Sequence, residues 1–320
     1  MQDTPQPFDI SLAGLDKAAW LTRIADISEE RGHFQPLGKK HFASFIDSGS
    51  TLLVSFESLQ GIETLSYNNR PLGWDMVATH GFSSLTLVSD GDTWFRDPHV
   101  YGYFDALIDD GFFDDFDTIL FYGAGPCGYA AAAFSVAAPG STVFAIQPQA
   151  TLDPRVTEWD DRFVHMRRTS FTDRYGYAPD MLDAATKAFV IYDPQVELDA
   201  MHAALFTRPN VEKFRLRFMG SAIQTELLDM QLLQTLLIRA VHGTLDTLSF
   251  AQLMRVRRDY PPYLRGILAA LDRQDRPWLA TMLCRNVLSR QKHAPRFARR
   301  LKALEREARD GNVRIPPATL

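Results

Sequence analysis

The stretch Thr118–Phe134, TILFYGAGPCGYAAAAF, decides the fold of this chain. It opens with an apolar run rich in β-branched and aromatic residues, which favours a strand covered on both faces. Three glycines follow within six positions, and an alanine-rich segment with high helix propensity comes next. The stretch therefore predicts a strand, a tight turn and a helix in direct succession, the repeating unit of an α/β domain.

Similar apolar runs occur on both sides of this unit, and helix-length patterns separate most of them. The runs are Thr51–Phe56, Ser84–Ser89, Thr142–Ile146, Ala188–Tyr192 and Lys213–Phe218. The intervening patterns are 101–108, 129–136, 179–186 and 199–207. Strands that alternate with helices form right-handed crossovers. We therefore predict a three-layer α/β domain around a mostly parallel sheet.

The two ends of the chain lack this alternation. Leu12, Trp20 and Ile24 recur at helical spacing, so residues 1–48 are expected to form a helical segment. After residue 225 the pattern is helical throughout, with breaks at prolines. The sequence thus predicts three parts: a helical segment at 1–48, an α/β domain at 49–225 and an all-helical C-terminal extension at 226–320.

Composition and charge narrow the class of protein. With 46% hydrophobic and 23% charged residues, the chain of 320 residues can bury a large core and is not disordered. Residues 251–320 hold 16 basic and 6 acidic residues, whereas residues 1–250 hold 18 and 33. No transmembrane segment and no secretion signal is recognisable, so we expect a cytoplasmic protein. Two cysteines are too few for a disulfide framework or a zinc cluster, and we predict no metal site.

The glycine-rich turn has two interpretations. Gly123, Gly125 and Gly128 match G-x-G-x-x-G, which binds a nucleotide cofactor such as NAD, FAD or S-adenosylmethionine in oxidoreductases and methyltransferases. The next strand, however, ends in Ala145–Gln147 rather than in the acidic residue that holds a ribose hydroxyl. Two strand units also precede this turn, whereas the fingerprint normally follows the first strand of its domain.

In the second interpretation the turn is the nucleophile elbow, G-x-S-x-G, of the α/β-hydrolase superfamily. Over about residues 48–225 the chain resembles bacterial surface-glycan and accessory-secretion members of that superfamily. The matching segments are Asp92–Phe95, Tyr129–Ala131, Gln147–Gln149 and Tyr192–Pro194. The resemblance implies an α/β-hydrolase fold, and it places Asp193 where the acid of the catalytic triad belongs.

The chain departs from the hydrolase pattern at three catalytic positions. Gly125 occupies the nucleophile position and has no side chain to acylate. Pro126 follows it and lacks the N–H that would stabilise an oxyanion. Residues 220–226, where the catalytic histidine should stand, contain none. We therefore expect a degenerate, non-catalytic protein that acts by binding a ligand or another protein, with a protein or a small anionic ligand as its partner.

Two further functions remain open besides the nucleotide-cofactor interpretation. Cys127 lies inside the turn and would make an atypical esterase if its thiol were activated, with His202 or His165 as candidate bases. A phosphoadenosine phosphosulfate reductase is a further possibility, but its phosphate loop and its cysteine motif are absent. The basic extension favours contact with an acidic surface over nucleic acid, because no nucleic-acid-binding module is recognisable. Oligomeric state is not predicted.

Overall fold

A computed structural model describes residues 10–317, and their contacts divide the chain into two compact units. The first unit comprises the described residues up to Arg217 together with Ser221–Leu253. The second comprises Phe218–Gly220 and the described residues from Met254 onward. The boundary therefore lies near residue 254, because three helices beyond residue 225 belong to the first unit. They are α9 (Ile223–Asp229), α10 (Leu233–Val241) and α11 (Thr247–Leu253).

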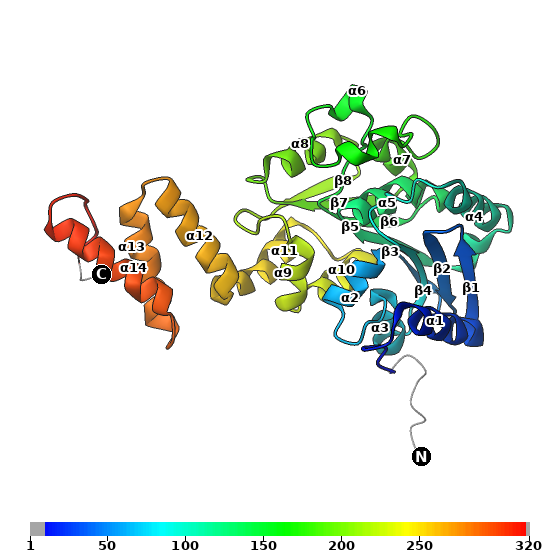
Figure 1. Cartoon of the computed structure of the whole chain (residues 1–320), viewed down its shortest axis with the longest axis horizontal. Coiled ribbons are helices and arrows are strands. Elements are labelled where there is room, and N and C mark those ends of the chain that lie inside the picture. Colours follow the sequence, from blue (N-terminus) through cyan, green and yellow to red (C-terminus); the bar gives the residue numbers. More distant parts are fainter. Residues whose placement is uncertain (1–9, 318–320) are drawn as a thin grey trace, which may run out of the picture. The chain divides into compact units, whose positions relative to one another are not determined.

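The first unit is built on an eight-stranded sheet with the order β1-β2-β4-β3-β5-β6-β7-β8 (Figure 1). β2 runs opposite to the other seven strands, which makes its pairings with β1 and β4 antiparallel and leaves the remaining pairings parallel. The strands are β1 (Gly32–Leu37), β2 (His41–Ile46), β3 (Thr51–Ser58), β4 (Ser83–Ser89), β5 (Thr118–Ala124), β6 (Thr142–Ile146), β7 (Lys187–Tyr192) and β8 (Val211–Arg215). This is the α/β-hydrolase fold, as the sequence resemblance predicted.

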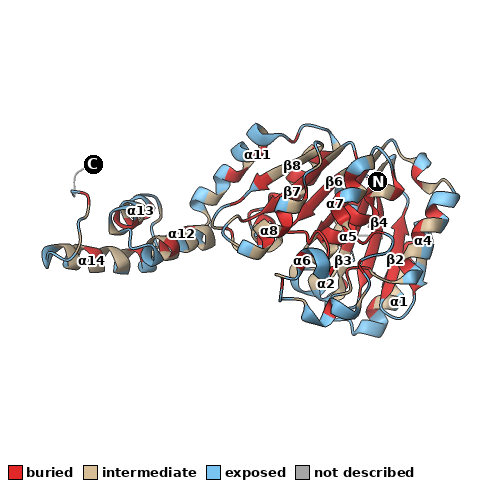
Figure 2. Ribbon diagram, turned by 90° about the horizontal axis from the view of Figure 1, so that it is seen from above, coloured by how far each residue is buried: buried red, intermediate tan, exposed pale blue. Residues whose placement is uncertain are grey.

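Helices cover both faces of the sheet, and each face has its own apolar core. On one face α4 (Pro98–Asp109) and α5 (Pro126–Phe134) pack on Phe56, Leu87 and Phe121. On the other, α1 (Lys17–Arg31) and α3 (Leu72–His80) pack on Phe42 and Val88. The strands β2 to β7 are almost entirely buried, unlike the edge strands β1 and β8 (Figure 2), which explains why most of them are continuous apolar runs in the sequence.

The prediction that residues 1–48 are helical is wrong beyond Arg31. Gly32–Leu37 and His41–Ile46 form an antiparallel hairpin that extends the sheet. β1 escaped notice because it contains Pro36, and proline is tolerated in a strand only at a sheet edge, where β1 lies. The helix expected at 179–186 is also wrong as a single element: α7 covers only Ala178–Met181, with a 3₁₀ turn at Leu182–Ala184.

Shorter helices complete the first unit: α2 (Leu59–Leu65), α6 (Pro154–Thr157) and α8 (Glu197–Leu205). The second unit contains α12 (Pro261–Arg273), α13 (Pro277–Arg290) and α14 (Pro295–Arg309). These three share a separate apolar core that includes Leu264, Leu268, Cys284, Phe297 and Leu304. The helical C-terminal region is thus confirmed. None of the described helices is both long and apolar enough to cross a membrane.

Candidate functional site

The turn between β5 and α5 has the backbone geometry of a strained elbow. Gly125 has φ 57° and ψ −125°, a conformation that side-chain-bearing residues rarely adopt. Its N–H donates to the carbonyl of Ile146 at 2.8 Å, which ties the turn to β6. Pro126 then begins α5, where its fixed φ suits the first helical turn. The chain therefore makes the sharp strand-to-helix turn on which hydrolases present a nucleophile.

The three glycines of the turn serve different purposes. A Cβ on Gly123 would stand 2.1 Å from the carbonyl oxygen of Cys127, and a Cβ on Gly128 would stand 2.9 Å from that of Ile146. A Cβ on Gly125 would meet nothing within 4 Å. Gly123 and Gly128 thus allow close approach of backbone to backbone, whereas Gly125 leaves an open space where a nucleophilic side chain would otherwise point.

Gln147 and Gln149, singled out by the resemblance, belong to a buried polar network beside the turn. The Gln149 amide oxygen accepts from the Trp94 indole N–H at 3.0 Å. The Gln147 amide donates to Asp199 at 2.7 Å, and its oxygen accepts the N–H of Ile223 at 3.1 Å. Gln147 therefore links the end of β6 to α8 and to the start of α9, so its side chain is engaged in holding the fold together.

His202, one of the two candidate bases, lies in the same network. Its Nδ1 accepts the N–H of Ala150 at 3.1 Å, so its Nε2 carries the proton and donates to Asp160 at 2.9 Å. Burial lowers the pKa of this imidazole. Both ring nitrogens are occupied within the protein. His165 is exposed on a 3₁₀ turn, and neither histidine lines the cavity described next.

Asp193, at the expected triad position, is buried after β7. Its Oδ1 accepts the N–H of Gln195 at 2.9 Å, a local turn that fixes the carboxylate. Its role as a triad acid stays a prediction.

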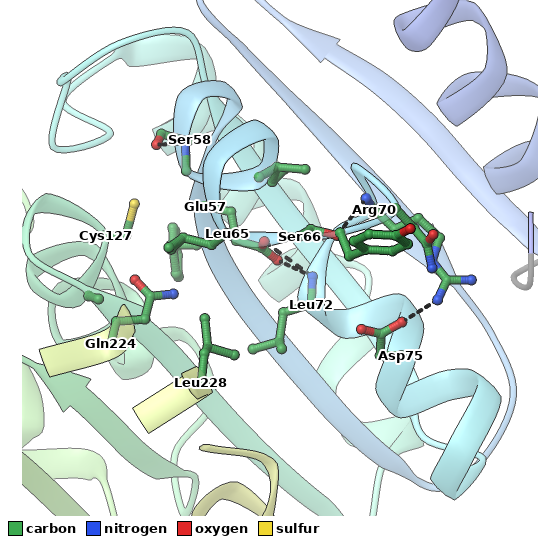
Figure 3. A pocket seen from close by; sticks show the side chains of 16 residues that line it. Glu57, Ser58, Leu65, Ser66, Arg70, Leu72, Asp75, Cys127, Gln224 and Leu228 are labelled. Atoms are coloured by element: carbon green, nitrogen blue, oxygen red, sulfur yellow. Dashed lines mark hydrogen bonds and ion pairs between the residues drawn. The ribbon is translucent and has the colours of Figure 1, made fainter. Parts of the chain in front are cut away.

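A cavity of about 210 Å³ lies at the carboxyl ends of β3 and β5, next to the turn (Figure 3). Leu65 and Leu72 contribute apolar wall, as does Leu228 of α9, and Cys127 and Gln224 line it as well. At roughly 30 Å³ for each water molecule, the volume suits a small organic molecule. It lies at the sheet edge where α/β domains bind their ligands.

Glu57, the last residue but one of β3, brings a carboxylate to this cavity. Its oxygens accept the N–H of Leu72 at 3.1 and 3.2 Å and the hydroxyl of Ser55 at 2.9 Å. Burial raises the pKa of Glu57 from 4.5 to about 7, and those hydrogen bonds oppose the shift. No ion pair joins Glu57 to a cation within residues 10–317. Glu57 is therefore a proton-exchanging group near neutral pH.

Sequence reasoning missed Glu57. The available signal was an acidic residue directly after the apolar run of a central strand, at the sheet edge that carries ligands. This signal is weak in the sequence alone, because the helices that form the cavity are far apart in the chain: α2, α3, α5 and α9.

Cys127 is half-buried and lines the same cavity, but its thiol is a poor nucleophile. Burial raises its pKa far above the ordinary range, and the negative charges of Glu57 and Asp92 raise it further. Reactive cysteines need the opposite environment, one that stabilises a thiolate.

Comparisons with known proteins found distantly similar solved structures. No protein-family model and no curated protein matches the sequence. An esterase from Pyrobaculum calidifontis is 14% identical, with a TM-score of 0.42 over 70% of this chain and 87% of that chain. The capsule O-acetyltransferase of Neisseria meningitidis serogroup A is 11% identical, with a TM-score of 0.35 over 61% and 91%.

A third similar structure is a glycosylation-associated protein complex from Streptococcus agalactiae. It is 12% identical, with a TM-score of 0.39 over 61% of this chain and 44% of that chain. These TM-scores are low, so the similar structures do not identify the fold, whereas the strand order of the sheet does. By that order, the chain has the α/β-hydrolase fold.

Proposed function

We propose that the first unit binds a small molecule in the cavity beside Gly125 and carries out no acyl transfer. The observation that supports this most is the elbow itself, which keeps its strained geometry but has no side chain at Gly125 and no N–H at Pro126. A missing oxyanion donor alone costs about 3 kcal/mol of transition-state stabilisation. A missing nucleophile removes the acyl-enzyme route entirely.

Cys127 allows the proposal to be tested, because its thiol reports whether the cavity is occupied. In a Cys284→Ser background it is the single cysteine, and a methanethiosulfonate reagent at alkaline pH would modify it slowly but measurably, because this reagent traps even a small thiolate fraction. A bound small molecule should slow that modification. Leu228→Trp, which places bulk in the cavity, should slow it without ligand. A burst of product from activated esters would contradict the proposal.

Nucleotide cofactor binding on Gly123, Gly125 and Gly128 stays the alternative prediction. Close packing inside the turn already accounts for Gly123 and Gly128. A thermal shift with NAD, FAD or S-adenosylmethionine would favour the alternative.

A second binding function belongs to α14, and we propose an acidic protein surface as its partner. One face of this helix carries five exposed cations at spacings of three and four residues: Arg296, Arg299, Lys302, Arg306 and Arg309. Arg299, Lys302 and Arg306 form no ion pair with any residue in 10–317, whereas Arg300 on the adjacent face is paired with Asp272 and Glu307.

Binding to a poly-glutamate peptide tests this partner, with duplex DNA as the competing polyanion. The full chain should bind the peptide at low salt, and Arg299→Glu/Arg306→Glu should lose that binding. Arg255→Glu, an exposed arginine outside α14, serves as the control. A chain that binds DNA but not the peptide would contradict the proposal.

A further inference from the structure

We infer that the cavity beside Gly125 selects a small organic cation, an alkylammonium ion, whose charged head pairs with Glu57 and whose alkyl part lies on Leu65 and Leu228. This inference rests on the proposed binding function and names its ligand class. It contrasts with the small anionic ligand expected from the sequence.

The charged side chains that line the cavity favour a cation. Three charged side chains line it: Glu57, Asp75 and Arg70. Arg70 is paired with Asp75, with Nη2 and Oδ1 2.7 Å apart, so these two largely cancel. Glu57 is left as the carboxylate that faces the cavity without a cation from residues 10–317.

Among the described residues, the other groups around Glu57 bring no positive side-chain charge next to its carboxylate. From α3 it meets the N–H groups of Leu72 and Gly73, which favour its ionised form, and the negative charge of Asp75, which opposes it. From β5 and α5 it faces Tyr122 and Cys127, whose pKa values its charge helps to raise. From α9 the cavity receives only the uncharged Gln224 and Leu228.

The hydrogen bonds from Leu72, Gly73 and Ser55 offset only part of the cost of burying the Glu57 charge, so a positive charge placed beside ionised Glu57 would stabilise it further. An anion would add a second negative charge to a desolvated site. A neutral alcohol could accept a proton from Glu57 but would gain no charge attraction.

The shape of the cavity agrees with an amphipathic cation. Figure 3 shows Glu57 between Leu65 and Leu72, with Leu228 and Cys127 lining the same space. A molecule whose head reaches Glu57 therefore has apolar wall within reach for its chain.

Isothermal titration calorimetry of the full chain measures binding of three matched probes: butylammonium, butan-1-ol and butyrate. Butylammonium should bind at least tenfold more tightly than butan-1-ol, and butyrate should not bind. Affinity for butylammonium should weaken by about tenfold for each pH unit below 7, as Glu57 takes up its proton.

Glu57→Gln should abolish the preference for butylammonium over butan-1-ol, whereas Glu63→Gln, an exposed carboxylate outside this cavity, should leave it intact. Equal affinities for butan-1-ol and butylammonium, or no binding of butylammonium, overturn the cation assignment. Equal affinities that Leu228→Trp abolishes leave the proposed binding function standing. Acylation of Cys127 by an activated ester instead overturns the proposed function itself.

Discussion

The space around Gly125 and its backbone conformation have opposite consequences for a substitution at this position. The space beside it is open, but its positive φ disfavours any residue with a Cβ. Gly125→Ser should therefore fold, with a loss of about 2 kcal/mol in the free energy of unfolding, measured by urea denaturation. It should not gain esterase activity, because Pro126 supplies no N–H and no histidine lines the cavity.

Gly123→Ala is the matched comparison, because its new Cβ would meet the Cys127 carbonyl at 2.1 Å. This variant should lose about 3 kcal/mol or more, since backbone must move to admit the methyl group. Equal losses in the two variants would contradict the division of roles among the glycines.

Glu57 should make stability depend on pH in a defined direction. Its folded pKa of about 7 exceeds the ordinary value of 4.5, so between these values the folded state holds the proton and the unfolded state has lost it. The free energy of unfolding should therefore fall as pH rises from 4.5 to 7, by up to about 3 kcal/mol.

Glu57→Gln should remove this slope, and Glu63→Gln should not. Urea denaturation at a series of pH values measures it. A wild-type slope indistinguishable from that of Glu57→Gln would show that Glu57 titrates normally in the folded protein.

At the scale of elements, buried hydrogen bonds hold the loop after β6 against α8. His202→Ala would take one hydrogen-bond donor from the buried carboxylate of Asp160, which keeps its ion pair with Arg162, and would leave the N–H of Ala150 unsatisfied. We expect a loss of about 2 kcal/mol in the free energy of unfolding. His165→Ala, at an exposed site, should change it by less than about 0.5 kcal/mol. Similar effects of both substitutions would argue against a structural role for His202.

How far the sequence predicted each element depended on burial and length. β3 to β7 were predicted nearly to their ends because each is a buried apolar run next to a helix-length pattern. The 179–186 segment failed because its four-residue helix is held by tertiary contacts and not by a periodic face. The sequence motif located the elbow, Cys127 and Asp193. It could not indicate Glu57, because the cavity that contains Glu57 is formed by four helices that are far apart in the chain.

For the whole molecule, the two compact units should unfold separately. A chain ending at Leu253 should keep the sheet unit folded, because α9 to α11 pack within that unit and α12 to α14 have their own core. Circular dichroism and urea denaturation of the shortened chain should show one cooperative transition at the urea concentration of one of the two transitions of the full chain. An unfolded shortened chain would contradict the division near residue 254.

The charge asymmetry read from the sequence follows the same division. The excess of basic residues lies in the second unit. The excess of acidic residues lies in the sheet unit, which also contains the cavity with Glu57. The sequence could show the asymmetry but not that Arg299, Lys302 and Arg306 share an exposed helix face without ion pairs to residues 10–317.

The most direct test of the central claim, a binding site without acyl transfer, is the intact mass of the full chain after incubation with an activated acetyl ester and with a fluorophosphonate. We expect an unchanged mass for wild type and for Cys127→Ser, while a methanethiosulfonate reagent still reaches Cys127 in parallel samples. A stoichiometric acetyl or phosphonyl adduct on wild type that is absent from Cys127→Ser would contradict it.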